Sequence, residues 1–416
     1  MQKNAFPRFF LSLLKLDITY FTKSSLWATL QQIIGVTCGL IVSYFFGHFL
    51  SKTTFGEYNL ILSYLGMLTF LSLPGLDLAL TQSVSKKFDG SLIFAINSKF
   101  KFSLLGIPIL LAISGYHFLQ QQNQISTGLL IAALLFPFLN PFSIYPAFLT
   151  GKRNFSVLSI VSSLASLFFL VLLSVSIFYF PKTPLLIFSY MMALIIPAII
   201  GFYYCLRLVK NNTQDKELFR YGSFLTILSI IPWITGNLGS IILGNFINVE
   251  ALAIYAVASK FLTSVQKNFQ VFYKPITAKL ASQSNKEHLN TLKTHWWKFF
   301  ILGIFLSLFL FLLTPILINF FFGSKYQDAI VYGQVLSLAL IPLPFSWVVY
   351  DMVMYQKRKK PQIIAGVLPQ LVKIVLIFIL IPRYQIWGLI IIILIERWTE
   401  PIVPFIALAL SSHKKK

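Results

Sequence analysis

Apolar runs of roughly 20 residues alternate with short polar segments along the whole chain. A helix of about 20 apolar residues crosses the hydrocarbon core of a bilayer, so each run predicts one membrane-spanning helix. The runs are centred near Thr37, Met67, Leu105, Pro137, Phe168, Ile195, Ile234, Leu262, Leu308, Leu343, Val372 and Ile395. The pattern therefore predicts an all-α polytopic membrane protein with about twelve transmembrane helices.

The basic residues fall almost entirely on alternate loops between these runs. When Lys260 is counted with the loop that follows it, 28 of the 34 Lys and Arg lie on the side of the N-terminus and two more, Lys373 and Arg397, lie inside runs. The other four lie on the opposite side: Lys52, Lys182, Lys325 and Arg383. Short loops rich in Lys and Arg stay in the cytoplasm. We therefore predict a bacterial inner-membrane protein with both termini in the cytoplasm.

Composition supports this class. With 57% hydrophobic residues, 11% charged residues and a mean hydropathy of +0.78, the chain is not a soluble globular domain. The net charge of +22 reflects topology and attraction to anionic membrane lipids, and we predict no nucleic-acid binding. Cys38 and Cys205 lie in apolar runs, where we expect buried hydrophobic side chains and no disulfide or metal site.

A polar segment at 210–220 divides the chain into two halves of six runs each. An offset of 197 residues aligns Phe55-Gly-Glu-Tyr58 with Leu252-Ala-Ile-Tyr255. Because six is even, both halves enter the membrane in the same direction, which predicts a parallel repeat about an axis along the membrane normal. The predicted organisation is an amphipathic cytoplasmic helix (1–23), an N-lobe (24–209), a cytoplasmic linker (210–220), a C-lobe (221–410) and a basic tail (411–416).

Lys260, Lys267 and Lys274 share the eighth run. Seven residues are nearly two helical turns, so the three lysines drift only ~20° per step and form one stripe. A charge inside the membrane costs a few kcal/mol, and Lys260 lies roughly 14 Å deep at 1.5 Å per residue. Lys274 is expected to snorkel to the cytoplasmic interface, whereas Lys260 is expected to line a cavity. For Lys267 both interpretations stay open.

A second charged group comprises Lys373 in run eleven and Glu396, Arg397 and Glu400 in run twelve. Paired carboxylates in a low dielectric could form a proton- or ion-coupling site. The alternative is a charge-compensated lock between two antiparallel helices. We favour the lock because both signs are present and can neutralise each other.

Other polar side chains inside the runs are candidate sugar contacts: Gln31, Gln32, Tyr64, Trp233 and Asn237. Amides and aromatic rings in a cavity suit sugar recognition. The same side chains could equally form hydrogen bonds between helices, and the sequence does not choose between the two roles.

The outer loops are short and poor in acids. The carboxylates predicted on that side are Glu57, Glu250 and Asp328, one per loop. A membrane glycosyltransferase or polymerase needs acids as bases or metal ligands, and an ATP-driven pump needs a glycine-rich phosphate loop. We therefore predict neither an enzyme nor a cofactor.

The segments Thr54-Phe-Gly-Glu-Tyr-Asn-Leu60, Gly75-Leu-Asp-Leu-Ala-Leu-Thr-Gln82 and Val249-Glu-Ala-Leu-Ala-Ile-Tyr-Ala-Val-Ala-Ser259 resemble the polysaccharide-repeat flippases. These are the O-antigen and capsule exporters of the multidrug/oligosaccharidyl-lipid/polysaccharide superfamily. The resemblance implies two lobes around a central cavity that Lys260 and Lys267 face, with the last two spans behind it. It also implies an oligosaccharide on a polyprenyl pyrophosphate as substrate, carried from the inner to the outer leaflet. Expected partners are membrane lipids and a polysaccharide polymerase complex.

Three other functions compete with this one. A multidrug or small-solute antiporter would share the fold, but a lysine stripe repels the cations that drug exporters commonly accept. A membrane glycosyltransferase or polymerase is disfavoured by the acid-poor outer face. A non-transporting scaffold would not explain charges inside the membrane.

Overall fold

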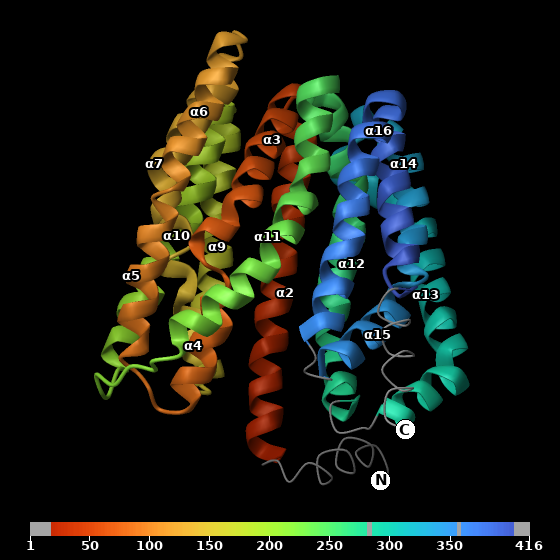
Figure 1. The fold of residues 1–416 in the computed structure, drawn as a ribbon. Helices are drawn as coiled ribbons and strands as arrows, with labels where there is room; N and C mark the ends of the chain where they lie inside the picture. The colour runs from red at the N-terminus through yellow and green to blue at the C-terminus, as the bar shows by residue number, and fades with distance from the viewer. Residues whose placement is uncertain (1–17, 281–284, 356–358, 403–416) are drawn as a thin grey trace, which may run out of the picture. The chain divides into compact units, whose positions relative to one another are not determined.

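The computed structural model describes residues 18–280, 285–355 and 359–402, and these residues form helices joined by short loops, with no strand among them (Figure 1). This confirms the predicted all-α class. The predicted N-terminal helix lies outside the described residues except for 18–23, where α2 (Ile18–Phe49) begins. The predicted basic tail also lies outside them.

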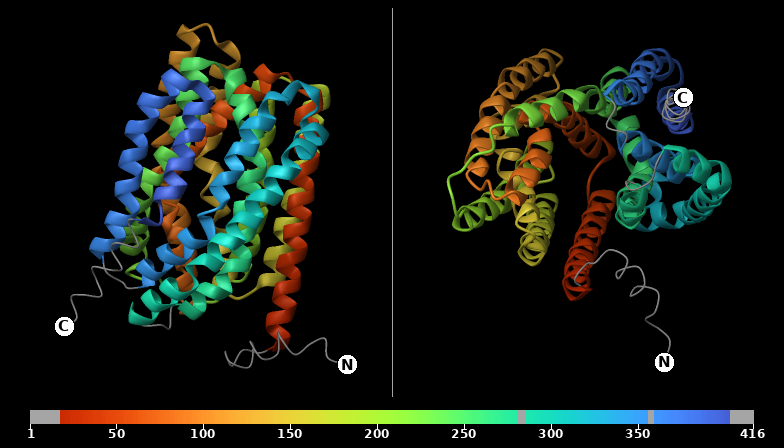
Figure 2. Two further views of the ribbon diagram at one scale, coloured as in Figure 1. Left: turned by 90° about the vertical axis from the view of Figure 1, so that its right-hand side faces the viewer. Right: turned by 60° about the horizontal axis from the view of Figure 1, so that its bottom comes forward.

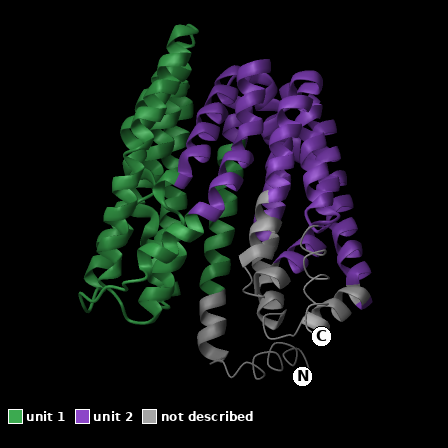
Figure 3. Ribbon diagram, in the orientation of Figure 1, with its two compact units in different colours: residues 1–43, 71–226 green, residues 44–70, 227–416 purple. Residues whose placement is uncertain are grey.

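The chain forms two compact units, coloured separately in Figure 3. Unit 1 comprises residues up to Ser43 together with Leu71–Thr226, and unit 2 comprises Tyr44–Phe70 and the chain from Ile227 onward. Two long helices, α2 and α11 (Leu218–Ile242), and the short helix η1 (Thr69–Ser72) contribute residues to both units.

Unit 1 is built from helices that run back and forth, with short loops between them. After the first part of α2, its elements are α4 (Gly75–Ser85), α5 (Ser91–Ser103), α6 (Gly106–Leu119), α7 (Asn123–Leu139), η2 (Phe142–Ile144), α8 (Tyr145–Gly151), α9 (Phe155–Tyr179), α10 (Thr183–Arg207) and the start of α11. Its core lies where α4, α5, α8 and α10 meet, around fully buried side chains such as Leu80, Leu92 and Phe148.

Unit 2 contains the end of α2, most of α11 and all the later helices. Its further elements are α3 (Lys52–Leu68), η1 (Thr69–Ser72), the π-helix η3 (Leu243–Ile247), α12 (Val249–Leu280), α13 (Asn285–Phe322), η4 (Ser324–Tyr326), α14 (Asp328–Ser337), η5 (Leu338–Leu340), α15 (Leu343–Tyr355) and α16 (Lys359–Thr399).

Three predicted spans are bent pairs of helices. The pairs Lys52–Ser72 with Gly75–Ser85, Asn123–Leu139 with Phe142–Gly151, and Asp328–Leu340 with Leu343–Tyr350 bend by 44°, 40° and 41°. Each break holds a proline, at Pro74, Pro141 or Pro342. Proline lacks the N–H that would continue the helical ladder, which explains the bends.

The long helix α16 is a hairpin of two antiparallel arms (Figures 1 and 2). Gln385 has φ 52° and ψ −123°, a conformation that no helix contains, and Pro382 precedes it. In a straight helix Lys373 and Glu396 would lie roughly 35 Å apart at 1.5 Å per residue. Their side chains instead form an ion pair of 2.8 Å. The two arms correspond to the predicted runs eleven and twelve.

By length and composition, seven helices in the described part of the chain could cross a membrane, or ten if each bent pair is one span. The ten include α16 as a single helix, and they omit α12, which carries the three lysines. Counting α12 and both arms of α16 gives one helix for each of the twelve predicted runs.

The contacts divide the chain differently from the predicted lobes. Residues 44–70 were assigned to the N-lobe, yet they group with the second half of the chain. The second boundary falls at Thr226, inside α11, and not in the polar segment 210–220. Close backbone contacts explain the difference: a Cβ on Gly47 would lie 2.3 Å from the backbone oxygen of Phe321, and one on Gly56 would lie 1.9 Å from that of Val249.

The predicted linker 210–220 is anchored to unit 1. The fully buried Asp89 accepts hydrogen bonds through Oδ2 from Lys152 Nζ (2.6 Å) and from the backbone N–H of Lys210 (3.0 Å). Ser83 Oγ donates to Asp215 Oδ2 at 2.7 Å, and this hydrogen bond holds the pKa of Asp215 below its usual value. The linker is therefore an ordered part of unit 1.

The loop charges predict which side of the membrane each loop faces, and labelling can check this prediction. Single cysteines at the exposed positions Asn123 and Lys182, in a chain without its native cysteines, should react with a membrane-impermeant maleimide added outside intact cells. A cysteine at the exposed Lys216 should react only after the membrane is opened. If only position 216 were labelled in intact cells, the protein would have the opposite orientation in the membrane.

Candidate functional site

A polar stripe runs along one face of α12. Between Ala251 and Asn268, the exposed side chains are Lys260, Thr263 and Lys267. Spacings of three and seven residues place all three on one helix face. The helix segment before them is mostly buried, with Ala253 and Val257 fully so. The described part of the predicted stripe, Lys260 and Lys267, is therefore exposed at the protein surface, and Thr263 lies within it.

Neither stripe lysine is neutralised by a carboxylate. Among the described residues, no acid lies within ion-pair distance of Lys260 or Lys267. The hydroxyls of Thr263 and Ser264 donate to the backbone oxygen of Lys260 at 2.9 and 2.8 Å, so both hydroxyl protons are bonded within the helix. Two unpaired ammonium groups on one face are an available site for an anion. The side chain of Lys274 lies outside the described residues.

The candidate sugar contacts have different surroundings. Gln31 is half-buried and Gln32 is exposed, both on the part of α2 that belongs to unit 1. Trp233, on α11 in unit 2, is half-buried. Their role in sugar binding stays a prediction.

Tyr64 and Asn237 fit the packing role better than the binding role. Tyr64 is 5% exposed, and its hydroxyl accepts a hydrogen bond from Asn245 Nδ2 at 2.7 Å. Asn237 donates to the backbone oxygen of Trp233 at 2.9 Å, and its side chain lies directly over Gly66 of α3. Both residues join α3 to the α11–η3 segment within unit 2.

The second charged group forms two ion pairs. Lys373 Nζ lies 2.8 Å from Glu396 Oε2, and these side chains are 12% and 13% exposed. Arg397 pairs with Glu400 at 2.9 Å, one turn along the same arm. Each acid therefore has its own cation, which is the arrangement that the lock interpretation requires.

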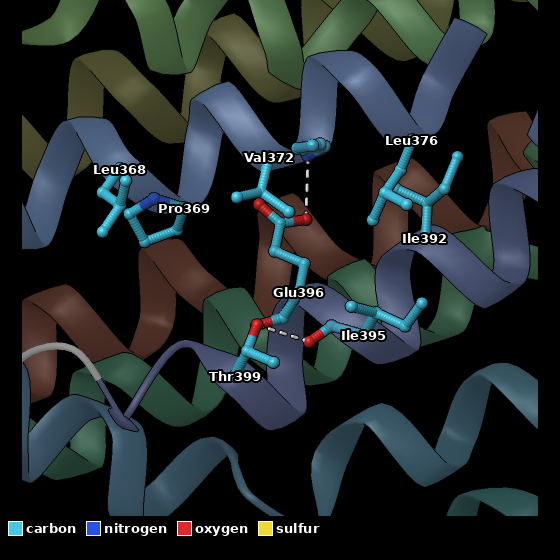
Figure 4. Close-up of a pocket in the computed structure, with 9 residues that line it drawn as sticks. Leu368, Pro369, Val372, Leu376, Ile392, Ile395, Glu396 and Thr399 are labelled. Atoms are coloured by element: carbon cyan, nitrogen blue, oxygen red, sulfur yellow. Dashed lines mark hydrogen bonds and ion pairs between the residues drawn. The ribbon is translucent and has the colours of Figure 1, made fainter. Parts of the chain in front are cut away.

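The Lys373–Glu396 pair lies in a cavity of about 180 Å³ between the two arms of α16 (Figure 4). Apart from the pair, the cavity is lined by Leu368, Pro369, Val372, Leu376, Ile392, Ile395 and Thr399. Thr399 uses its hydroxyl within its own helix, donating to the backbone oxygen of Ile395 at 2.6 Å. The lining is mostly apolar, so breaking the pair would leave a charge with few alternative partners.

Gln370 extends the charged group to a third helix. Its Nε2 donates to Glu396 Oε1 at 3.5 Å, and its Oε1 accepts a hydrogen bond from the buried Thr235 of α11. The sequence interpretation missed both residues, because a lone amide or hydroxyl in an apolar run gives no sign of its partner.

The sequence interpretation also missed an ion pair between two of the predicted spans. Lys99 of α5 pairs with Asp77 of α4 at 2.5 Å, and the side chains are 2% and 41% exposed. Lys99 was grouped with the cytoplasmic loop cations, whereas it lies inside the span Ser91–Leu119. An acid and a lysine inside neighbouring apolar runs are the signal that could have found the pair.

Because the Lys99 side chain is buried and the Asp77 side chain is partly exposed, replacing one or the other should destabilise the protein to different extents. Asp77→Asn leaves a buried, unpaired ammonium and should destabilise the protein by about 3–5 kcal/mol. Lys99→Met leaves a carboxylate that still reaches solvent and should cost less. The double variant should recover abundance in membranes, measured by size-exclusion of a fluorescent fusion. Glu217→Gln, in the exposed Arg220–Glu217 pair, should change little. Equal losses in both single variants would contradict this interpretation.

Comparison with known proteins places the chain in a family. The polysaccharide biosynthesis protein family matches residues 21–279. The chain belongs to this family, whose flippases are part of the multidrug/oligosaccharidyl-lipid/polysaccharide superfamily. The match includes α2 to α12 and so contains the lysine stripe. The comparison with curated proteins gives no match.

Solved structures share the fold. A multidrug resistance MATE family transporter in an inward-facing conformation has a TM-score of 0.72 at 14% identity, covering 92% of this chain and 99% of its own. The lipid II flippase MurJ, in an inward closed conformation, gives 0.64 at 15% identity, covering 94% and 87%. A superfamily transporter from Pyrococcus furiosus, with a binding pocket of reverse polarity, gives 0.61 at 14% identity, covering 95% and 97%. These likenesses confirm the predicted all-helical membrane-protein fold.

Proposed function

We propose that this protein is a flippase that carries polyprenyl-pyrophosphate-linked polysaccharide repeat units from the inner to the outer leaflet of a bacterial inner membrane. The observation that carries the proposal is the exposed, unpaired stripe of Lys260, Thr263 and Lys267 on a helix of a polysaccharide biosynthesis family member. Oligosaccharide repeats for O-antigen or capsule, made on the cytoplasmic side, would be the cargo.

The chemistry of the stripe matches the headgroup. A pyrophosphate carries several negative charges in a small volume, and lysines bind phosphate as point charges. A lumen of lowered effective dielectric strengthens each contact to a few kcal/mol. The polyprenyl tail can stay in the surrounding lipid while the two lobes alternate their access to the headgroup.

The same stripe weighs against export of cationic drugs. Two unpaired ammonium groups would repel a cation, and among the described residues no carboxylate lies within ion-pair distance of either one. The family match likewise points to polysaccharide synthesis. A small-solute antiporter of the same fold is the competing function.

Deleting the gene and analysing membrane lipids tests the proposal directly. We expect surface polysaccharide to fall and a polyprenyl-pyrophosphate-linked oligosaccharide to accumulate, detected by mass spectrometry of extracted lipids. Expression of the wild-type chain from a plasmid should reverse both changes. Unchanged lipid-linked sugars together with increased drug sensitivity would instead establish the antiporter.

A further inference from the structure

Two helices of unit 1 end in the same way, each with a pair of cations. Lys86 and Lys87 follow the last turn of α4, and Lys152 and Arg153 follow that of α8. Lys87 has φ 71° and Arg153 has φ 58°, the left-handed conformation that favours glycine at the end of a helix. Backbone strain of this kind is concentrated at functional sites. Cations in place of glycine at both helix ends therefore point to a role for their charges.

A fully buried carboxylate joins these two helix ends to the 210–220 linker. Asp89 Oδ2 accepts hydrogen bonds from Lys152 Nζ at 2.6 Å and from the backbone N–H of Lys210 at 3.0 Å. Asn211 Nδ2 donates to the backbone oxygen of Lys87 at 3.0 Å, and its Oδ1 accepts from the backbone N–H of Asp89 at 3.3 Å. Three segments that are distant in the sequence are thus fixed against one another at one end of unit 1 (Figure 1).

The fixed segments present cations to solvent. Their exposed basic side chains, which we call the basic platform, are those of Lys86, Lys87, Arg153, Lys210 and Lys216. Among the acids of the same segments, Asp89 is paired with Lys152. Glu217 lies 3.7 Å from Arg220, and Asp215 is half-buried. The basic platform therefore keeps a net positive charge.

Exposed aromatic rings flank the linker on both sides. Tyr203 and Tyr204 precede it on α10, and Phe219 and Tyr221 follow it on α11. Aromatic side chains are enriched where a membrane meets water, at the level of the lipid headgroups. Cations at that level face the phosphates of anionic lipids. The combination suits a lipid better than a soluble acidic protein.

We propose that the basic platform binds the phosphate of an anionic phospholipid in the leaflet predicted to be cytoplasmic. Lysine and arginine bind phosphate through charge-assisted hydrogen bonds. Because Asp89 and Asn211 fix the three segments beforehand, little freedom is lost when their cations gather on one phosphate. The site lies in unit 1, apart in the sequence from the lysine stripe of α12, and it does not depend on what the protein transports.

The stability of the purified protein with and without lipid tests the site. Adding phosphatidylglycerol in detergent should raise the temperature of thermal unfolding by several degrees, because a ligand that binds the folded state stabilises it. Phosphatidylcholine with the same acyl chains, and inorganic phosphate at the same concentration, should not. High salt should reduce the phosphatidylglycerol shift. An equal shift with phosphatidylcholine or with inorganic phosphate would overturn the lipid-phosphate site.

Paired variants locate the effect on the protein. Lys87→Gly/Lys210→Ala removes two charges of the basic platform and should lose most of the phosphatidylglycerol shift. The matched control Lys182→Ala/Lys298→Ala removes the same charge from exposed positions elsewhere and should keep the shift. A full shift in the platform variant, or an equal loss in both variants, would overturn the proposal and leave the proposed function standing.

Lys87→Gly alone separates binding from a structural role. Glycine relieves the left-handed strain, so stability without lipid should not fall, while the phosphatidylglycerol shift becomes smaller. A loss of stability without lipid, together with an unchanged shift, would show that this lysine only caps α4. Lys260→Ala/Lys267→Ala should keep the full shift, and a loss there would assign the lipid to the stripe and overturn the platform.

Discussion

Replacing Lys260 and Lys267 together by alanine should abolish surface polysaccharide while protein abundance stays normal. Both side chains are exposed and neither is paired among the described residues, so their removal breaks no contact that holds the fold. Each charge-assisted contact to phosphate is worth about 1.5–3 kcal/mol, so a single variant should lose roughly ten- to a hundredfold in transport. The measurement is complementation of the deletion strain, with abundance followed by immunoblot.

Graded variants separate charge from shape. Lys260→Ala should have the larger effect, and Lys260→Arg should keep part of the activity because a guanidinium retains the charge. Lys274→Ala, on the same helix, and Lys298→Ala, at an exposed position beside Trp297, each remove one charge and should do little. Wild-type polysaccharide in the Lys260→Ala/Lys267→Ala variant would end the headgroup proposal.

The second large effect concerns the lock between the arms of α16. Glu396→Gln/Glu400→Gln should sharply reduce membrane abundance, because it leaves Lys373 and Arg397 without their acids at sites that are mostly buried. Breaking a buried pair by removing one partner costs about 3–5 kcal/mol, a large part of the stability of most proteins. Abundance and thermal unfolding in detergent measure the loss.

A charge swap provides the matched control. Lys373→Glu/Glu396→Lys keeps both signs across the same 2.8 Å contact and should recover much of the abundance. A coupling site predicts the opposite pattern: normal abundance of the Gln/Gln variant, with loss only of ion-dependent transport. That result would show that these four charged residues form an ion-coupling site and not a structural lock.

The positions of the spans and their breaks could be predicted from the sequence. Twelve apolar runs correspond to helices or bent helix pairs, and Pro74, Pro141 and Pro342 mark the bends. The reason is local: whether a segment enters a bilayer depends on its own transfer free energy, and a proline disrupts the helix that contains it. The shared face of Lys260 and Lys267 is likewise fixed by helical periodicity alone.

Partners on different helices depended on the tertiary structure. The sequence placed Lys373 near Glu396 because their runs are adjacent. It showed an acid and a lysine in the neighbouring runs of Asp77 and Lys99 but not that the two side chains meet, and it gave no sign that Gln370 reaches Thr235. Such pairs depend on how each helix is rotated about its axis and tilted against its neighbours. Packing of small residues, and not span hydrophobicity, sets those angles.

By itself the sequence determined a membrane protein of about twelve helices with a cationic stripe on the eighth helix, and the repeat of its two halves stays a prediction. Only the tertiary structure decided that residues 44–70 pack with the second half and that Thr53 meets Glu250. Spans and stripes follow from local hydrophobicity and periodicity. The position of the 44–70 segment follows from close backbone contacts at Gly47 and Gly56, residues far apart in the sequence from their partners.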